Sequence, residues 1–277
     1  MKLLLLSIFI ISSHAYGFRL NTNIGAKFED AHVKIYVTSN STCDEAGISN
    51  SELLSIVMDA ADDFWNKVPT SNLKIKEGGI LETSDSLFLT GELCANDSES
   101  DCNASTSVPN VNNIVIACNS DTTKNFPSSS YLAISAPLKI SGSNIEGSII
   151  LINNSANTTF KNLSRSQMVS VLAHEIGHAV GLGHSNKSEA LMYYKNSDKF
   201  SKLAQDDIDG ISYLYPNKLD GCTGFLGTMG LDDEHNDENQ NTFLLSILLG
   251  IMLSLLLLIL AKIKSFLTLH SRRKLKS

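Results

Sequence analysis

Two histidines four residues apart, followed by a third six residues later, could together hold a metal ion. Residues 174–178 read HEIGH, and on a helix the imidazoles of His174 and His178 would lie one turn apart on the same face. A catalytic zinc commonly takes three protein ligands and keeps one position for water, so a third ligand is required. Gly181 would let the chain leave the helix without a steric penalty, which brings His184 within reach of the same ion. We therefore predict one catalytic Zn²⁺ held by these histidines.

The glutamate inside this stretch has the chemistry of a general base. Three neutral imidazoles leave the zinc its positive charge, which lowers the pKa of bound water. Glu175 could take the proton of that water and later deliver it to a leaving amine. A bare H-E-x-x-H also arises by chance on solvated helix faces, but Gly181 and His184 at these offsets argue against chance. The isolated histidines are interpreted as ordinary strand, linker and tail residues: His32, His235 and His270.

The sequence around these histidines resembles a known family. Residues 171–185 (VLAHEIGHAVGLGHS) are similar to the H-E-x-x-H-x-x-G-x-x-H signature of metzincins, specifically the matrixin branch. Residues 190–193 (ALMY) resemble its Met-turn and residues 203–211 its C-terminal helix; with a weaker likeness further back, the resemblance covers roughly residues 32–216. It implies an α+β metzincin fold: a twisted, mostly parallel sheet with two long helices, and a cleft above a small lower subdomain. It also implies a zinc-dependent endopeptidase acting on proteins and peptides.

The resemblance extends to residues beyond the ligands. Met192 would form a hydrophobic floor beneath the imidazoles without binding the metal. Tyr194 stands where matrixins usually have proline; astacins and serralysins have tyrosine there, able to approach the zinc and stabilise an oxyanion, but an aromatic pocket wall is equally compatible. Asp206 and Asp207 resemble acidic residues that brace the Met-turn, with a merely solvated helix start as the competing interpretation.

The chain also departs from the matrixin pattern. The P-R-C-G-x-P-D segment does not occur, so latency through that cysteine is not expected, although Cys43 or Cys222 could cover the zinc instead. Residues 147–153 (GSIILIN) lack the histidine and aspartate that hold a structural zinc and calcium in animal matrixins. We expect the catalytic ion alone, without structural calcium or a second zinc.

Hydrophobic segments near both ends predict export and a membrane anchor. Residues 1–15 combine a lysine, an apolar run and small residues in the order of a signal peptide. Residues 243–261 carry no charge and are long enough to cross a bilayer as a helix. Acidic residues precede this segment and basic residues follow it, which places the larger part outside the cytoplasm, at a cell surface, in a secretory lumen or in a periplasm. The expected organisation is a signal peptide (1–15), a catalytic domain (16–218), an acidic linker (219–242), a transmembrane helix (243–261) and a basic cytoplasmic tail (262–277).

Charge and cysteine usage agree with an exported enzyme. The net charge of −7 disfavours a nucleic-acid partner. The chain has 5 cysteines, all in the part expected to be exported, where disulfides can persist, and one must remain unpaired in a monomer. Cys94 and Cys102 bracket a polar loop and form the preferred bridge, with Cys43 and Cys118 as the second choice. The lack of a C-x-x-C pair argues against a cysteine zinc site.

Hydrophobic periodicity predicts the elements that must position the site. Residues 51–68 and 204–215 have the pattern of amphipathic helices, the first capped by Ser51. Ser164 and Gln167 form a capping box at the start of the helix that carries the histidines. Residues 77–113 are expected to be rich in loops, and short strands are expected at residues 32–38, 73–75, 87–89, 113–117, 131–136 and 148–152.

Three functional interpretations remain. In the first, an extended peptide lies along the edge strand near Leu132 and Ala133 and is hydrolysed with the help of Glu175. In the second, the metal stabilises an ectodomain that binds or adheres without turnover, and the presence of Glu175 argues against this. In the third, a gluzincin-type peptidase uses Glu189 as its third ligand, which the spacing of His184 argues against.

Overall fold

The computed structural model describes residues 18–217, except residue 41, residues 94–112 and residue 196. All of these described residues lie in the first of the two units into which the chain divides, Met1–Leu219 and Asp220–Ser277. The predicted signal peptide, acidic linker, transmembrane helix and tail lie outside the described residues. Within the part that the structure describes, no helix has both the length and the apolar character needed to span a membrane.

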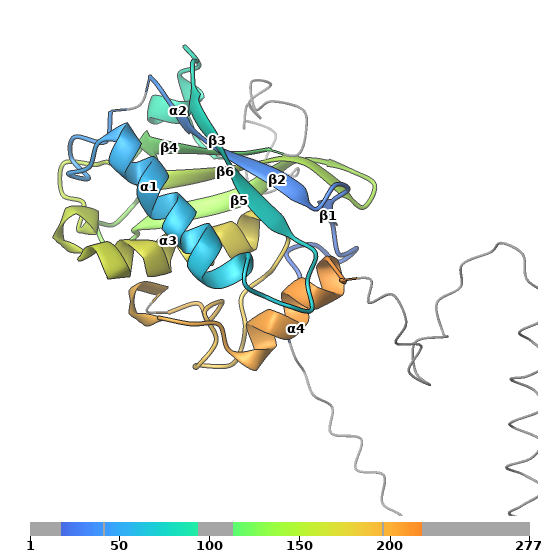
Figure 1. Cartoon of the computed structure of the whole chain (residues 1–277). Coiled ribbons are helices and arrows are strands. Elements are labelled where there is room, and N and C mark those ends of the chain that lie inside the picture. The colour runs from blue at the N-terminus through green and yellow to red at the C-terminus, as the bar shows by residue number, and fades with distance from the viewer. Residues whose placement is uncertain (1–17, 41, 94–112, 196, 218–277) are drawn as a thin grey trace, which may run out of the picture. The chain divides into compact units, whose positions relative to one another are not determined.

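A six-stranded sheet forms the centre of the fold (Figure 1). Its main path runs β1-β6-β4-β2-β3, with β5 paired to β6, and every pairing is parallel except that of β5 with β6. The prediction of a mostly parallel sheet is confirmed. The strands are β1 (Lys27–Phe28), β2 (His32–Thr38), β3 (Lys74–Leu81), β4 (Asn113–Asn119), β5 (Ala133–Ser141) and β6 (Asn144–Asn153).

Helices cover the sheet unequally. α1 (Asn50–Ala60), which continues into a π-helical turn at Ala61–Trp65, and α3 (Arg165–Ala179) pack over one face. The short α2 (Leu87–Thr90) contributes to the other face. α4 (Gln205–Leu214) follows the active-site segments, and 3-10 turns occupy Phe160–Asn162 and Ser197–Lys199. The indole Nε1 of Trp65 donates to the carbonyl oxygen of Ala173 at 2.8 Å, which ties the end of the α1 segment to the middle of α3.

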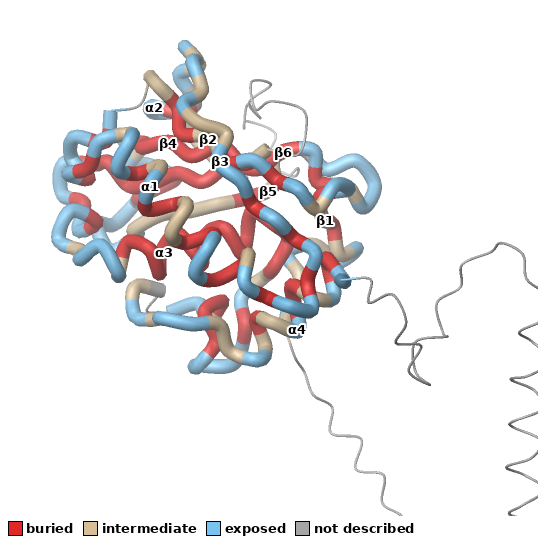
Figure 2. The backbone as a smooth tube through the Cα atoms, viewed as in Figure 1, coloured by how far each residue is buried: buried red, intermediate tan, exposed pale blue. Residues whose placement is uncertain are grey.

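The apolar runs of β4 and β6 supply both faces of the sheet, which explains why these strands do not alternate with polar residues. Ile114 and Ile116 of β4 point into the large core beneath α1 and α3, whereas Val115 and Ala117 point into a smaller core on the other face. α3 is accordingly buried along most of its length (Figure 2). Burial of this extent fixes the position of the helix that carries His174, Glu175 and His178.

Several sequence predictions are corrected by the structure. Residues 87–89 form the short helix α2 and not a strand, because the amides of Phe88 and Leu89 bond back to the carbonyls of Asp85 and Ser86, and Phe88 fills the smaller core. Residues 77–81 of the region expected to be loop-rich belong to β3. The cap of α1 is Ser49 and not Ser51.

The disulfide prediction has a divided outcome. The second choice, Cys43–Cys118, is present, with a Cα–Cα distance of 5.3 Å. It joins the segment after β2 to strand β4. Cys94 and Cys102, the preferred pair, lie outside the described residues, as does Cys222.

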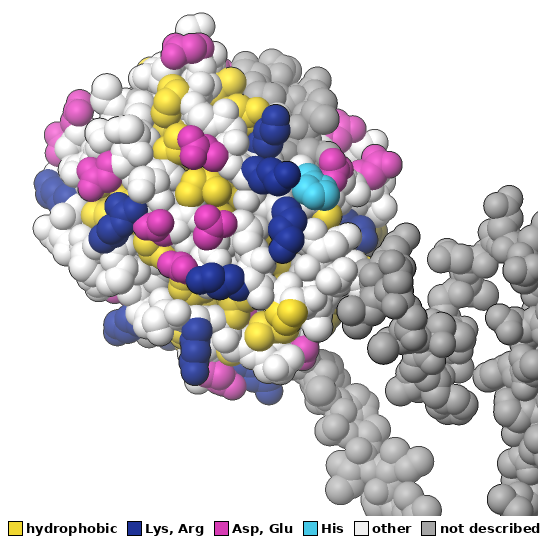
Figure 3. Space-filling view, in the orientation of Figure 1, with side chains coloured by type: hydrophobic (Ala, Val, Ile, Leu, Met, Phe, Trp, Pro, Cys, Tyr) yellow, Lys and Arg dark blue, Asp and Glu magenta, His cyan; other side chains and the backbone are white. Residues whose placement is uncertain are grey.

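Charged side chains of both signs are interspersed on the face of the described domain that carries α1 (Figure 3). Arg165, at the start of α3, bonds to Asp59 and Ser55 of α1, with the ion pair at 2.6 Å. Exposed ion pairs of this kind contribute about 0–1 kcal/mol each. The association of the two helices therefore depends on their buried faces.

Candidate active site

α3 begins and ends at residues that fix the direction of its histidines. Ser164 and Gln167 form the predicted capping box, with the Ser164 amide donating to the Gln167 side chain at 3.0 Å. At the other end, Gly181 has a φ of +113°, and a Cβ there would lie 2.4 Å from the carbonyl oxygen of Ala26. Only glycine accommodates both the backbone conformation and this close approach. The chain can therefore turn sharply after α3 and return towards the metal site.

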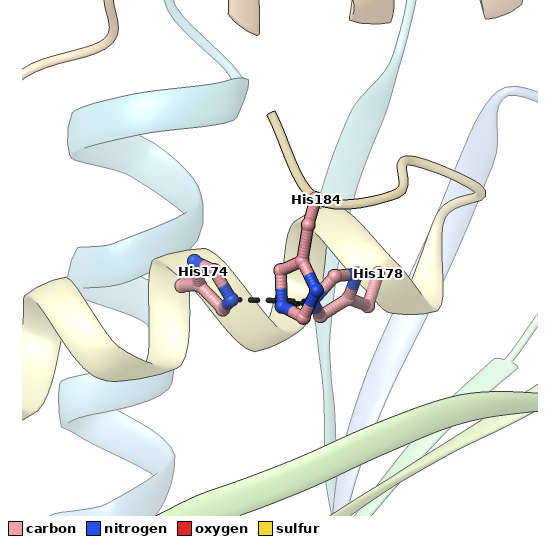
Figure 4. A group of neighbouring side chains, drawn as sticks. All are labelled: His174, His178 and His184. Carbon is pink, nitrogen blue, oxygen red and sulfur yellow. Dashed lines mark hydrogen bonds between the residues drawn. The ribbon is translucent and has the colours of Figure 1, made fainter. Parts of the chain in front are cut away.

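The structure brings His174, His178 and His184 together (Figure 4). Nε2 of His178 lies 3.1 Å from Nε2 of His174 and 3.1 Å from Nε2 of His184. His174 and His178 are buried, whereas His184 is exposed to the cleft. Among the described residues, these three histidines form the one group of His, Cys, Asp or Glu side chains whose ligand atoms lie close enough to share an ion.

Backbone carbonyls determine which nitrogen of each buried ring is free for a metal. Nδ1 of His174 lies 2.7 Å from the carbonyl oxygen of Leu191, and Nδ1 of His178 lies 2.8 Å from that of Leu182. Since a carbonyl only accepts, each Nδ1 must donate, and each Nε2 of a neutral ring is left with its lone pair. Burial, the largest effect, lowers the pKa of all three imidazoles and favours these neutral rings.

This donor set fits zinc. Lone pairs facing one another at 3.1 Å repel unless a cation lies between them. Four ligands at about 2.0–2.1 Å around a tetrahedral zinc would be separated by about 3.3 Å, close to the distances between these nitrogens. The remaining position of such an ion would face the cleft, because His184 and Glu175 both line it.

The Met-turn lies directly against the ligand helix. A Cβ on Gly177, between the two ligands of α3, would lie 2.3 Å from the sulfur of Met192, so glycine is needed for this contact. Met192 is buried, as expected for a floor beneath the imidazoles. The buried carboxylate of Asp207 accepts from the amides of Leu191, Met192 and Ala204 at 2.8, 3.0 and 2.8 Å.

Asp206 and Asp207 take different positions around the Met-turn. Asp206 accepts from the hydroxyl of Ser185, next to His184, at 2.5 Å. Asp207 is 1% exposed, which excludes the interpretation of this residue as a solvated helix start. The bracing suggested by the family resemblance is thus present in the hydrogen bonds of this chain.

Glu175 is buried beside the ligands and has a partner that the sequence analysis missed. The hydroxyl of Ser135 on β5 donates to Oε2 of Glu175 at 2.6 Å. Burial raises the pKa of Glu175 to about 7, and the hydrogen bond from Ser135 opposes this rise. The two residues are 40 positions apart, so no local spacing indicates the contact. Because residues two apart in a strand point to the same face, Ala133 and Ser135 share one face of this edge strand. This was the only sequence signal that Ser135 faces α3.

A cleft of about 800 Å³ opens over these residues. Residues 130–135 line it, as do Tyr194, Lys195 and Asp198. The ring centroid of Tyr194 is 6.5 Å from that of His184, and the side chain is 55% exposed. The structure therefore places Tyr194 at the cleft wall, and its suggested role at an oxyanion stays a prediction.

The other candidate residues are not brought to the site. Cys43 is held in its disulfide and cannot cover a metal. Glu189 is exposed and does not belong to the group of possible ligands. His32 bonds to Asp30 at 3.1 Å, and Cys222, His235 and His270 lie outside the described residues.

Comparison with known proteins agrees with this arrangement. Residues 114–216 match the family model described as matrixin. The chain is 59% identical to mouse (Mus musculus) stromelysin-1 over 49 residues, 46% identical to metalloendoproteinase 5-MMP of Arabidopsis thaliana over 57 residues, and 37% identical to mouse matrix metalloproteinase-19 over 79 residues. These matches cover 16%, 20% and 28% of this chain and only 10%, 16% and 12% of the relatives' own lengths.

The matched region contains the three histidines and the Met-turn, and matrixins use zinc, which these histidines could hold as a single ion. The family match therefore includes the residues that form the candidate site. Residues 114–216 thus resemble the catalytic domain of a matrixin metalloprotease.

Proposed function

We propose that this chain is a zinc-dependent endopeptidase that hydrolyses peptide bonds of proteins outside the cytoplasm, with Glu175 as its general base. One observation carries the proposal: three Nε2 atoms converge next to a buried carboxylate at the floor of an open cleft. The family match and the relatives named above support the reaction class.

The proposed roles follow from the contacts of each side chain. His174, His178 and His184 would hold the ion, with two of the rings oriented by backbone carbonyls. Zinc in this position would polarise the scissile carbonyl and lower the pKa of water. Glu175 would accept the proton of that water and pass it to the leaving amine. Its burial, which raises the pKa to about 7, makes it a stronger base than an exposed glutamate.

β5 offers a place for the substrate backbone. Within the described residues, this strand pairs only with β6, so its other edge keeps unpaired backbone groups. Residues 131–135, which lead into β5 and form its first three positions, line the cleft together with the three histidines. An extended peptide can add to such an edge as a further strand, which would lay its carbonyl groups across the metal position.

The test is proteolysis by the full chain, purified in detergent and loaded with zinc. We expect cleavage of an unfolded protein substrate that stops when a chelator is added and returns with zinc. Glu175→Gln should lower kcat by at least about 100-fold, because general-base catalysis contributes 10²–10⁴-fold. Zinc content, measured by atomic absorption, should stay the same in this variant.

Two outcomes would contradict the proposal. Zinc binding by the wild-type chain without cleavage of any tested protein would favour a metal-stabilised binding or adhesion ectodomain. Equal cleavage by wild type and Glu175→Gln would remove the glutamate from the mechanism.

We further propose that the catalytic domain is exported and tethered to a membrane by residues 243–261. The composition of residues 1–15 and 243–261 supports this, and so does the Cys43–Cys118 disulfide, since such bonds persist in oxidising compartments. An epitope inserted after residue 217 should be accessible to antibody on intact cells or spheroplasts, whereas one after residue 277 should need permeabilisation. Equal labelling of both epitopes would refute the topology.

A further inference from the structure

Two serines on neighbouring strands bond to α3 in almost the same way. Ser135 on β5 lies 3.0 Å from the carbonyl oxygen of Glu175, and Ser148 on β6 donates to the carbonyl oxygen of Ala179, one turn further along, at 2.7 Å. Each hydroxyl therefore connects the sheet to the ligand helix. Only Ser135 has a second acceptor in reach, since its hydroxyl also lies 2.6 Å from Oε2 of Glu175. The bond of Ser148 therefore only attaches the helix to the sheet, whereas Ser135 also contacts the Glu175 carboxylate.

The hydrogen bond from Ser135 holds one oxygen of the Glu175 carboxylate and does not involve the other oxygen. Its length of 2.6 Å is typical of a hydroxyl that donates to an ionised carboxylate. Within the described residues, Oε1 of Glu175 makes no hydrogen bond. The one fully buried side-chain oxygen or nitrogen without a partner among these residues is Oδ1 of Asn40, so Oε1 of Glu175 must be accessible to solvent. Glu175 itself lines the cleft. The two oxygens are thus distinct: Oε2 is anchored to the strand and Oε1 is available to the cleft.

Without this bond the carboxylate would lose its orientation. The terminal torsion of a glutamate is broad, because rotation of the planar carboxylate has no steep staggered minima. Burial at 6% exposure restricts the aliphatic part of Glu175 but does not by itself select one oxygen for the cleft. A displacement of about 1 Å at a reacting group can cost about 100-fold in rate.

We propose that Ser135 is a positioning residue for the Glu175 carboxylate, which it holds so that Oε1 faces the substrate and water. The inference rests on the proposed function of Glu175 as general base. Ser135 itself does not touch the substrate in this role and acts through the orientation of the glutamate.

The experiment compares Ser135→Ala, Ser135→Thr and Ser148→Ala in the zinc-loaded full chain. Ser135→Ala should lower kcat about 10-fold or more with KM within about twofold, since it disturbs the base and keeps the backbone groups of β5 that would pair with a peptide. Ser148→Ala removes an equivalent strand-to-helix bond without contacting the carboxylate, so kcat should stay within about twofold. Ser135→Thr keeps the hydroxyl on a residue suited to a strand and should stay within about threefold of wild type.

A second measurement does not depend on turnover. In infrared difference spectra of the metal-free chain, Ser135→Ala should shift a carboxylate band, Ser148→Ala should not, and the shift should be absent when Glu175→Gln is also present. Wild-type protein that fails to cleave would count against the proposed function, while these spectra would still test the Ser135 bond.

The proposal would be overturned by any of three results: full activity in Ser135→Ala, equal losses of kcat in Ser135→Ala and Ser148→Ala, or a Ser135→Thr variant as slow as Ser135→Ala. An unshifted carboxylate band in Ser135→Ala would overturn it as well. Equal losses in the two alanine variants would mean that both serines only attach α3 to the sheet.

Discussion

The three histidines depend on residues that never approach the metal position. The ring of His174 is oriented by the carbonyl of Leu191, and that carbonyl is held because the amides of Leu191 and Met192 both donate to Asp207. A single buried carboxylate therefore connects α4 to the ligand set through the Met-turn. Partners of this kind commonly matter for metal affinity nearly as much as the ligands do.

Asp207→Asn tests this connection at the residue scale. Asparagine keeps the shape but has one acceptor oxygen, so at least one of the three backbone amides would face an amide donor. We expect the free energy of unfolding to fall by about 2–3 kcal/mol and the zinc Kd to rise about 10–100-fold. Urea denaturation and competition with a fluorescent chelator would measure the two effects.

Asp209→Asn is the matched control for Asp207→Asn. Asp209 lies on the same helix and is exposed, and within the described residues it accepts a hydrogen bond only from the side chain of Gln205. Its replacement should change both quantities little, within about 0.5 kcal/mol for stability. Similar effects of the two substitutions would show that α4 needs charge and not the specific bonds of Asp207.

At the scale of elements, the sequence predicts contacts between residues that are close along the chain and misses contacts between distant residues. The capping box at Ser164 and the turn at Gly181 involve neighbours in sequence, and both are found as expected. The strand prediction at residues 87–89 is wrong because a short apolar run between Ser86 and Thr90 resembles a buried strand, whereas its backbone closes into a helical turn. The Ser135 contact joins a strand and a helix 40 residues apart, so it depends on the packing of whole elements.

Tyr215 shows how one side chain can join three elements. Its hydroxyl donates to the carbonyl of Val180, after α3, and accepts from the amide of Phe28 in β1, both at 2.9 Å. Tyr215→Phe would leave both backbone groups unpaired in a buried site, which should lower the free energy of unfolding by about 1–3 kcal/mol at pH 8. Urea denaturation would measure the loss, and Tyr213→Phe, at an exposed position of α4, should change stability by less than about 0.5 kcal/mol.

The contribution of Tyr215 should also depend on pH. Burial raises the pKa of Tyr215 above its ordinary value of 10.0, so the folded state favours the neutral phenol. The associated stability is complete below the pKa of the unfolded chain and is lost as pH rises towards the folded pKa. The difference in unfolding free energy between wild type and Tyr215→Phe should therefore shrink above about pH 10. A difference that stayed constant between pH 8 and pH 11 would contradict this account.

At the scale of the whole described domain, the proposed catalytic residues and the disulfide lie on different elements. The parallel strands and α1 form a frame, on which α3, the Met-turn and α4 assemble the site. Periodicity predicts the separate helices and strands of this frame, whereas its mostly parallel sheet is predicted by the family resemblance. Neither selects among cysteine pairings, because the choice depends on which Cα atoms the fold brings within about 7 Å.

Removing the Cys43–Cys118 bond should weaken the frame and spare the metal site. The bond joins residues with a sequence separation of 75, and closing a loop of that size restricts the unfolded chain by about 4 kcal/mol. We expect a Cys43→Ala/Cys118→Ala variant to lose free energy of unfolding of this order in urea denaturation without reductant. Reductant should destabilise wild type much more than this variant, which controls for the remaining cysteines. The three histidines proposed as zinc ligands lie outside residues 43–118, so the zinc Kd in the native state should change less than about threefold. A larger change would mean that the frame and the site are not independent.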